Sequence, residues 1–143
     1  MTRILYTAHG SALHGGRNGG QAQTDDGKLN VKLSVPKAMG GDDGPGTNPE
    51  QLFAVGYSAC FLGAMQTAAR RLGKKLPEGA TISANVSFAD REDKIGYAII
   101  AELTGSVPGW SVGEVEEAMT LAHDVCPYSN LIRFPHDVKL TAV

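Results

Sequence analysis

Short stretches of alternating apolar and polar residues occupy the first third of the chain. In residues 29–35 the apolar side chains recur at every second position and share one face: Leu29, Val31, Leu33 and Val35. Residues 5–8 form another short apolar segment, and glycine-rich turns lie between the two. A period of two residues is typical of a half-buried strand, so both segments are predicted to be strands.

The segment GGDDGPGTNPE has the composition of a loop that ends where a helix begins. Thr47 or Asn48 can cap that helix with a side-chain oxygen. Pro49 suits the first turn, where no N–H is needed, and Glu50 suits the positive end of the helix dipole. Residues 49–71 are therefore predicted to form a long helix.

This predicted helix is apolar around most of its circumference. The following positions cannot share one narrow stripe: Leu52, Phe53, Val55, Ala59, Cys60, Leu62, Ala64 and Met65. A helix of this kind is buried on several sides. Because so short a chain has little sheet to cover the helix, we expect a partner subunit to do so and predict a homodimer.

The second half of the chain predicts a hairpin, because residues 82–88 and 97–103 alternate apolar and polar positions on either side of a charged tip, DREDK. Residues 138–142 alternate again and predict a last strand. Strands and helices in this order indicate an α+β fold. Residues 1–143 are expected to form a single domain.

A second helix is predicted to begin at Ser111, because Ser111 followed by Glu114 is a capping-box signature. Apolar residues then recur at helical spacing as far as Cys126, and Pro127 stops the helix. Cys126 is therefore predicted to point inward.

Composition excludes several classes of function. The chain carries 13 Lys plus Arg against 15 Asp plus Glu, a formal net charge of −2, and no basic run is interleaved with aromatic residues. This argues against nucleic acid as a partner. Neither a leader-like start nor an uninterrupted apolar run long enough to cross a bilayer is present, so we expect a cytoplasmic protein without a membrane partner.

The chain has two cysteines, too few for a secreted disulfide framework, and both are expected to be reduced. Packing of their helices would bring the sulfurs within bonding range. Free cysteines are also small buried hydrophobes, and composition leaves both interpretations open. Cys60 lies too deep in its helix for the dipole to help, so a thiolate there needs a cation, whereas Cys126 lies at a helix C-terminus that disfavours an anion. If the pair is redox-active, Cys60 attacks and Cys126 resolves.

Arg17 is the candidate cation. The glycines of GGRNGG let its loop approach closely and aim a long side chain inward. A buried arginine needs a carboxylate, and Glu50 stands at the start of the helix that carries Cys60. The residues alone favour a plainer interpretation, in which Arg17 is a solvated loop residue and Glu50 a helix-terminus acid.

Other chemistries have weaker support. His123 and Cys126 are one turn apart, but no Cys-x-x-Cys or paired-histidine spacing completes a zinc ligand set, so no metal is expected. GGDDGPG lacks the Gly-Lys-Ser/Thr of a phosphate loop, which argues against nucleotide binding. Ser58 lies outside any Gly-x-Ser-x-Gly elbow, which argues against a serine hydrolase.

The two cysteines lie in distinctive segments, GPGTNPEQLFAVGYSACFLGAM at residues 44–65 and AHDVCPYSN at residues 122–130. These segments resemble the cysteine segments of a known family, the organic hydroperoxide resistance proteins, a branch of the osmotically inducible protein C superfamily. The resemblance extends to LYTA, GGRNG, DGKLNVKLSVPKAMGG and DVKLTAV, and so covers nearly the whole chain. VCPYSN in particular separates this branch from its osmotically inducible relatives.

The resemblance implies an intertwined α+β homodimer in which antiparallel sheets wrap around long central helices, with active sites at the subunit interface. It implies that Cys60 is the peroxidatic cysteine, Cys126 the resolving cysteine, and Arg17 with Glu50 the salt-bridged pair that activates the thiolate. The implied reaction reduces alkyl, aryl or fatty-acid hydroperoxides to alcohols through a Cys60 sulfenic acid and a Cys60–Cys126 disulfide.

The implied reductant is an external dithiol, the dihydrolipoyl group of a lipoylated protein, and no tightly bound cofactor is expected. The preference for organic over hydrogen peroxide would come from a hydrophobic mouth. The side chains available to line it are Phe53, Tyr57, Phe61, Met65, Leu131 and Phe134.

Two positions depart from the pattern of the family. Asn18 stands where relatives usually have Asp, and LIRF replaces smaller residues after Asn130, with bulky Leu131 close to Cys126. Neither removes a reacting group. An alternative from another class is a non-catalytic protein that uses the same fold to bind an apolar ligand or to sense oxidation. An osmotically inducible relative would differ only in the ratio of its rates for organic and hydrogen peroxide.

Overall fold

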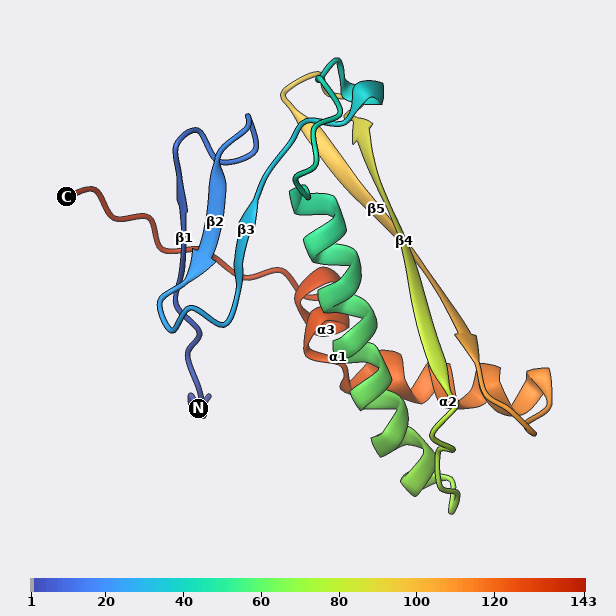
Figure 1. Cartoon of the computed structure of the whole chain (residues 1–143). Coiled ribbons are helices and arrows are strands. Elements are labelled where there is room, and N and C mark those ends of the chain that lie inside the picture. Colours follow the sequence, from blue (N-terminus) through green and yellow to red (C-terminus); the bar gives the residue numbers. More distant parts are fainter. Residues whose placement is uncertain (1) are drawn as a thin grey trace. The chain divides into compact units, whose positions relative to one another are not determined.

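The structure is a computed structural model that describes residues 2–143 and forms two compact units, Met1–Leu52 and Phe53–Val143. The first unit contains a small sheet. Its strands β1 (Gly10–Leu13), β2 (Gln21–Thr24) and β3 (Asn30–Lys32) are antiparallel and lie in the order β1-β2-β3, drawn in blue in Figure 1.

The strands of this unit are shorter than the alternating pattern predicts. Residues 5–8 are not a strand, because Leu5 and Tyr6 are each 80% exposed and no neighbouring strand pairs with them among the described residues. Of residues 29–35 only the middle joins the sheet. Leu33 leaves it to form a parallel bridge with Thr47, whose N–H donates to the carbonyl of Lys32 at 2.9 Å.

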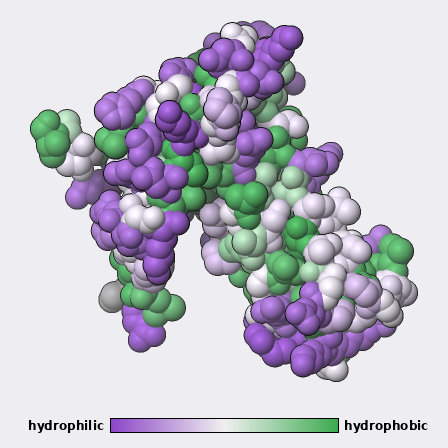
Figure 2. Space-filling model, in the orientation of Figure 1, coloured by the Kyte–Doolittle hydropathy of each residue, from purple (hydrophilic) through white to green (hydrophobic). Residues whose placement is uncertain are grey.

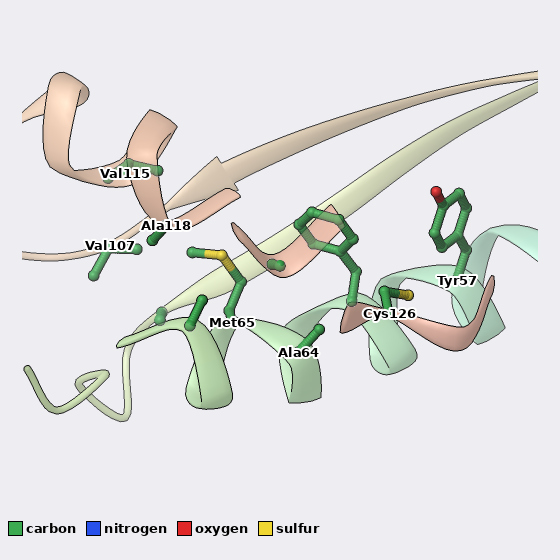
Figure 3. Packing of buried hydrophobic residues seen from close by; sticks show 11 residues of the cluster. Tyr57, Ala64, Met65, Val107, Val115, Ala118 and Cys126 are labelled. Carbon is green, nitrogen blue, oxygen red and sulfur yellow. The ribbon is translucent and has the colours of Figure 1, made fainter. Parts of the chain in front are cut away.

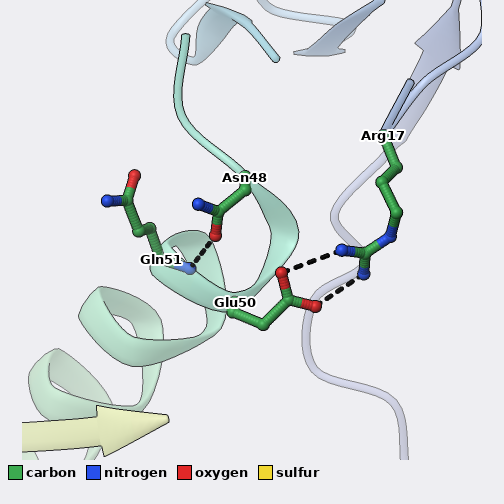
Figure 4. Close-up of polar contacts among 4 residues, drawn as sticks. All are labelled: Arg17, Asn48, Glu50 and Gln51. Atoms are coloured by element: carbon green, nitrogen blue, oxygen red, sulfur yellow. Dashed lines mark hydrogen bonds and ion pairs between the residues drawn. The ribbon is translucent and has the colours of Figure 1, made fainter. Parts of the chain in front are cut away.

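This bridge leads directly into helix α1 (Pro49–Arg71). The Asn48 side-chain oxygen accepts a hydrogen bond from the Gln51 N–H at 2.9 Å, which confirms Asn48 as the capping residue (Figure 4). Gly46 is required beside the bridge, since an added Cβ would lie 2.6 Å from the carbonyl carbon of Leu33. The backbone around residue 46 thus fixes where α1 begins and where Glu50 stands.

Helix α1 carries the core of the second unit. Its buried apolar side chains are Tyr57, Phe61, Ala64, Met65, Ala68 and Ala69. Figure 3 shows Tyr57, Ala64 and Met65 together with Cys126 from the chain beyond α2. By length and composition alone α1 could cross a membrane, contrary to the sequence expectation, yet its place in this cluster makes it the core helix of the unit.

Strands β4 (Thr81–Asp90) and β5 (Tyr97–Ser106) form the predicted antiparallel hairpin. Each strand is three residues longer than the alternating segment that predicts it. Gly105 lies where α2 packs on β5, and an added Cβ there would lie 2.7 Å from the sulfur of Met119. The hairpin is therefore held to the helices at its end rather than at its charged tip.

Helix α2 (Val112–Val125) begins with the predicted capping box. Glu114 N–H donates to Ser111 Oγ at 3.2 Å, and Ser111 N–H donates to Glu114 Oε2 at 2.8 Å. The helix ends at Cys126, and a further helix that the sequence pattern did not predict, α3 (Pro127–Arg133), follows at once.

The strand predicted at residues 138–142 is wrong. Within the described residues the chain after α3 has no regular structure, and Val138 and Leu140 are 77% and 89% exposed. Alternation alone does not make a strand when no neighbouring strand offers it hydrogen bonds.

Candidate active site

The second unit brings the two cysteines together. The thiol of Cys126 donates to the sulfur of Cys60 with the two Sγ atoms 3.5 Å apart, and both residues are reduced. A disulfide needs about 2.05 Å between sulfurs, so a shift of about 1.5 Å would allow the bond to form. Packing of the two segments therefore places the sulfurs as the redox interpretation requires.

The two thiols differ in access. Cys126 is completely buried, whereas Cys60 is partly exposed. A molecule arriving from solvent can therefore meet the sulfur of Cys60 first. This asymmetry is independent of the helix-position argument and favours the same order, with Cys60 as the residue that attacks.

Cys126 occupies the junction of two helices. It is the C-cap residue of α2 and also the N-cap residue of α3, and Pro127 occupies the first helical position of α3. The sequence pattern predicts Cys126 only at a helix C-terminus, because Pro127 indicates the end of α2. Proline is equally common at the first position of a helix, where its missing N–H costs nothing.

The immediate surroundings of Cys60 do not favour its thiolate. Burial is the largest cause that raises the pKa of the Cys60 thiol, and the neighbouring Cys126 raises it further, while a backbone hydrogen bond from Tyr128 lowers it. No cationic side chain is among these causes in the part of the chain that the structure describes. Thiolate chemistry at Cys60 therefore needs a positive charge from elsewhere.

Aromatic side chains join α1 to α3 beside the cysteines. Tyr57 stacks on Tyr128 with ring centroids 5.8 Å apart, and Phe53 approaches the same ring at 5.9 Å. Gly56 makes room for Tyr128, since a Cβ at that position would lie 2.9 Å from the tyrosine Oη. Behind these rings, Tyr57 Oη and Ser129 Oγ share a buried hydrogen bond of 2.7 Å.

An apolar cavity of about 660 Å³ opens in the second unit between α1, β5 and the two C-terminal helices. Of the six side chains that the sequence offered as a hydrophobic mouth, Phe53, Tyr57 and Phe61 line it. The other three do not line it. Met65 is fully buried in the core, and Leu131 and Phe134 are 48% and 60% exposed.

Polar side chains also line this cavity. Residues His123, Asp124 and Arg133 lie there, and Arg133 forms an ion pair with Asp124 at 2.7 Å. The described residues contain no group of three His, Cys, Asp or Glu side chains that could hold a metal ion. His123 lines the cavity from the last turn of α2.

The first unit brings together Arg17 and Glu50. The guanidinium donates two parallel hydrogen bonds to the carboxylate, Nη1 to Oε2 at 2.9 Å and Nη2 to Oε1 at 2.6 Å (Figure 4). Glu50 is buried, with 9% of its side chain exposed, while the Arg17 side chain is 33% exposed. Glu50 does lie in the first turn of α1, but it is not only a helix-terminus acid, and Arg17 is not simply a solvated loop residue, because the two side chains form an ion pair.

The ion pair is built by local backbone geometry. Arg17 lies in the turn between β1 and β2, where Gly15 and Gly19 have φ of +94° and +86° that disfavour larger residues. The hydrogen bonds from Arg17 lower the pKa of the Glu50 carboxyl, and those to Glu50 raise the pKa of the guanidinium. Both groups are thereby held in their charged forms.

The α+β fold with a reduced cysteine pair beside a core helix defines a class of thiol redox protein. The sequence pattern of the OsmC-like protein family matches residues 40–141. The chain belongs to this family and, within it, to the organic hydroperoxide resistance proteins. Members of this branch are cysteine-based organic hydroperoxide peroxidases.

Relatives match over nearly the full length of the chain. An organic hydroperoxide resistance protein of Xanthomonas axonopodis pv. citri is 46% identical over 139 residues, which cover 97% of this chain and 95% of that protein. The crystal structure of such a protein from Legionella pneumophila is 41% identical, with a TM-score of 0.82 over 96% of each chain.

A third relative has a ligand. It is a putative organic hydroperoxide resistance protein from Vibrio cholerae, crystallised with captopril in one of its active sites. It is 38% identical, with a TM-score of 0.80 over 93% of this chain and 88% of that chain. The long helix and antiparallel strands that the sequence predicts are thus those of the family.

Proposed function

We propose that the chain reduces organic hydroperoxides to alcohols, with Cys60 as the peroxidatic and Cys126 as the resolving cysteine. The observation that carries the proposal is the sulfur pair, 3.5 Å apart, with only Cys60 open to an incoming molecule. Membership of the organic hydroperoxide resistance proteins supports the same reaction.

The reaction proceeds in two steps. The Cys60 thiolate attacks the peroxide oxygen farther from the organic group, the O–O bond breaks, and the leaving oxygen takes up a proton to become the alcohol. Cys60 is then a sulfenic acid. The Cys126 thiol condenses with it, a sulfur–sulfur bond forms, and water leaves with the sulfenic oxygen.

Arg17 supplies the positive charge that Cys60 needs, and Glu50 holds the guanidinium in position. The raised pKa of the Cys60 thiol supports the need for a cation, and the bidentate Arg17–Glu50 pair supports Arg17 as an oriented one. The same charge would stabilise the oxygen anion that develops as the O–O bond breaks.

The preferred substrates are alkyl, aryl and fatty-acid hydroperoxides. The apolar cavity lined by Phe53, Tyr57 and Phe61 supports this preference, because burying an organic group there removes apolar surface from water. Hydrogen peroxide has no such group to bury. Captopril, in an active site of the Vibrio cholerae relative, shows that the relative's site admits an organic molecule.

The working protein is a cytoplasmic homodimer of single-domain chains whose disulfide is reduced by the dihydrolipoyl group of a lipoylated protein. Apolar side chains that stay on the surface of the chain, green among the purple in Figure 2, support a partner subunit. They include Val55 on α1 and Ile99 and Ile100 on β5. An extended dithiol suits a disulfide of which one cysteine, Cys126, is buried and the other, Cys60, is only partly exposed.

The proposal is tested by turnover with cumene hydroperoxide and dihydrolipoamide in wild type, Cys60→Ser and Cys126→Ser proteins. We expect steady consumption only in wild type, with a single-turnover reaction in Cys126→Ser and none in Cys60→Ser. A non-catalytic protein that binds an apolar ligand in the 660 Å³ cavity would give no turnover in any of the three. Its Cys60→Ser variant would differ only in thermal stability.

A further inference from the structure

Tyr57 and Ser129 form a polar contact inside an otherwise apolar region. Their hydroxyl groups are 2.7 Å apart, and the residues are 4% and 0% exposed. Tyr57 lies one helical turn before Cys60 in α1, and Ser129 lies one turn after Cys126 in α3. The bond therefore ties together the two segments that carry the sulfurs, at a point one turn from each sulfur.

Helix α3 needs such a tie. It has only seven residues, its N-cap residue Cys126 makes no side-chain capping hydrogen bond, and Pro127 has no N–H to donate. A helix this short has little stability of its own, so side-chain contacts must fix its position. The contacts with α1 include the Tyr57–Ser129 hydrogen bond and the packing of the Tyr128 ring against Tyr57 and Phe53.

The resolving step depends on that position. The Cys126 thiol must approach the oxidised Cys60 by about 1.5 Å beyond the 3.5 Å that separates the reduced sulfurs. The first step, attack of Cys60 on the peroxide, needs no movement of α3. Loosening α3 would therefore slow disulfide formation without slowing formation of the sulfenic acid.

We infer that Tyr57 and Ser129 are positioning residues for the resolving step, holding Cys126 within reach of the Cys60 sulfenic acid. The inference rests on the proposed function, since it concerns the second step of the same reaction. Neither hydroxyl touches the reacting atoms, and each acts only through the placement of Cys126.

The variants Tyr57→Phe and Ser129→Ala each remove one hydroxyl, and the double variant leaves no buried hydroxyl unpaired. Tyr57→Phe keeps the ring that stacks on Tyr128, and Ser129→Thr keeps a hydroxyl for Tyr57. We expect disulfide formation to slow about tenfold in Tyr57→Phe, in Ser129→Ala and in the double variant. Displacement of a reacting group by even 1 Å can cost about a hundredfold in rate. Ser129→Thr should recover most of the loss, and Tyr97→Phe on the exposed hairpin should match wild type.

The test follows both steps in fully reduced protein mixed with one equivalent of cumene hydroperoxide and stopped in acid at intervals. Mass spectrometry measures the amount of disulfide at each time, and dimedone trapping measures the amount of sulfenic acid. The expected result is sulfenic acid that accumulates in the three variants and that forms at the wild-type rate in Ser129→Ala, whose side chain does not line the cavity. Variants that unfold at lower temperature yet form disulfide at the wild-type rate would overturn the inference alone. Wild type that forms no disulfide would overturn the proposed function and the inference together.

Discussion

At the scale of single residues, the chemistry rests on two pairs with opposite electrostatic character. Burial raises the pKa of the Cys60 thiol, whereas the bidentate contact with Arg17 lowers the pKa of Glu50. The cysteine pair thus keeps Cys60 in its protonated, less reactive form, and the Arg17–Glu50 pair keeps a positive charge in a fixed orientation. In the reaction proposed for this chain, the charge of the second pair acts on the first.

Replacement of Arg17 by lysine tests this role of the charge. A lysine keeps the charge but loses the planar fork that matches both oxygens of Glu50. We expect peroxide consumption to fall about tenfold or more, and the pH midpoint for alkylation of Cys60 by iodoacetamide to rise.

The matched control for Arg17→Lys is Arg91→Lys, which alters an ion pair with Asp93 on the exposed hairpin tip. This control should leave both peroxide consumption and the alkylation midpoint unchanged. Equal activity of Arg17→Lys and wild type would exclude Arg17 from the reaction.

The lowered pKa of Glu50 makes a second prediction, about stability and pH. Since the ionised carboxylate is favoured in the folded state, the pair stabilises the protein fully above the ordinary glutamate pKa of about 4.3. The contribution is lost as pH falls through the lowered pKa of the folded state. The melting temperature of Glu50→Gln should therefore lie below that of wild type at pH 7 and converge with it in acid. A difference that stayed constant down to pH 3 would contradict this.

At the scale of elements, helix termini place two of the candidate site residues, Glu50 and Cys126. The Asn48 cap starts α1 next to Glu50, and the junction of α2 with α3 places Cys126. Both junctions consist of a few capping contacts, so single substitutions can test whether they matter for activity as well as for stability.

Asn48→Ala and Ser111→Ala form a matched pair of cap deletions. Each removes a side-chain oxygen that accepts a backbone N–H, and each should lower the free energy of unfolding by about 1 kcal/mol. Only Asn48→Ala lies beside Glu50, so only this variant should also slow the reaction of Cys60 with peroxide. Denaturant unfolding and single-turnover kinetics measure the two effects separately. Equal kinetics in the two variants would mean that the first turn of α1 does not position the ion pair.

The same elements explain what the sequence could and could not predict. The limits of α1 followed from local signals, Asn48 and Pro49 at its start and a continuous apolar run within it. Residues 5–8 and 138–142 were wrongly predicted as strands, because a strand depends on a neighbour that a local pattern does not supply. Helix α3 was missed because Pro127 can either stop a helix or start one.

For the candidate site, the sequence predicted the two residue pairs but not the contact between Tyr57 and Ser129 that holds their helices together. Cys60 with Cys126 and Arg17 with Glu50 were expected as pairs, from helix position and from the family resemblance, and both pairs are in contact. The Tyr57–Ser129 bond was not expected, since it joins segments that are distant in the chain and hydroxyl groups carry no periodic signal.

At the scale of the whole molecule, the surface of a single chain exposes apolar residues on α1 and β5. A homodimer would bury part of that surface. Sedimentation equilibrium of the reduced protein at micromolar concentration should give twice the mass of the chain. A mass equal to one chain would contradict the dimer, and turnover by that monomer would show that the partner subunit is not needed for catalysis.

The reaction proposed for Cys60 and Cys126 is tested most directly by the intact mass of the reduced protein after one equivalent of cumene hydroperoxide, with peptide mapping of both cysteines. The expected result is the loss of two hydrogens and a peptide in which Cys60 is joined to Cys126. An unchanged mass, or oxygen added at scattered methionine and cysteine residues, would contradict the proposed reaction and leave both cysteines as members of the core.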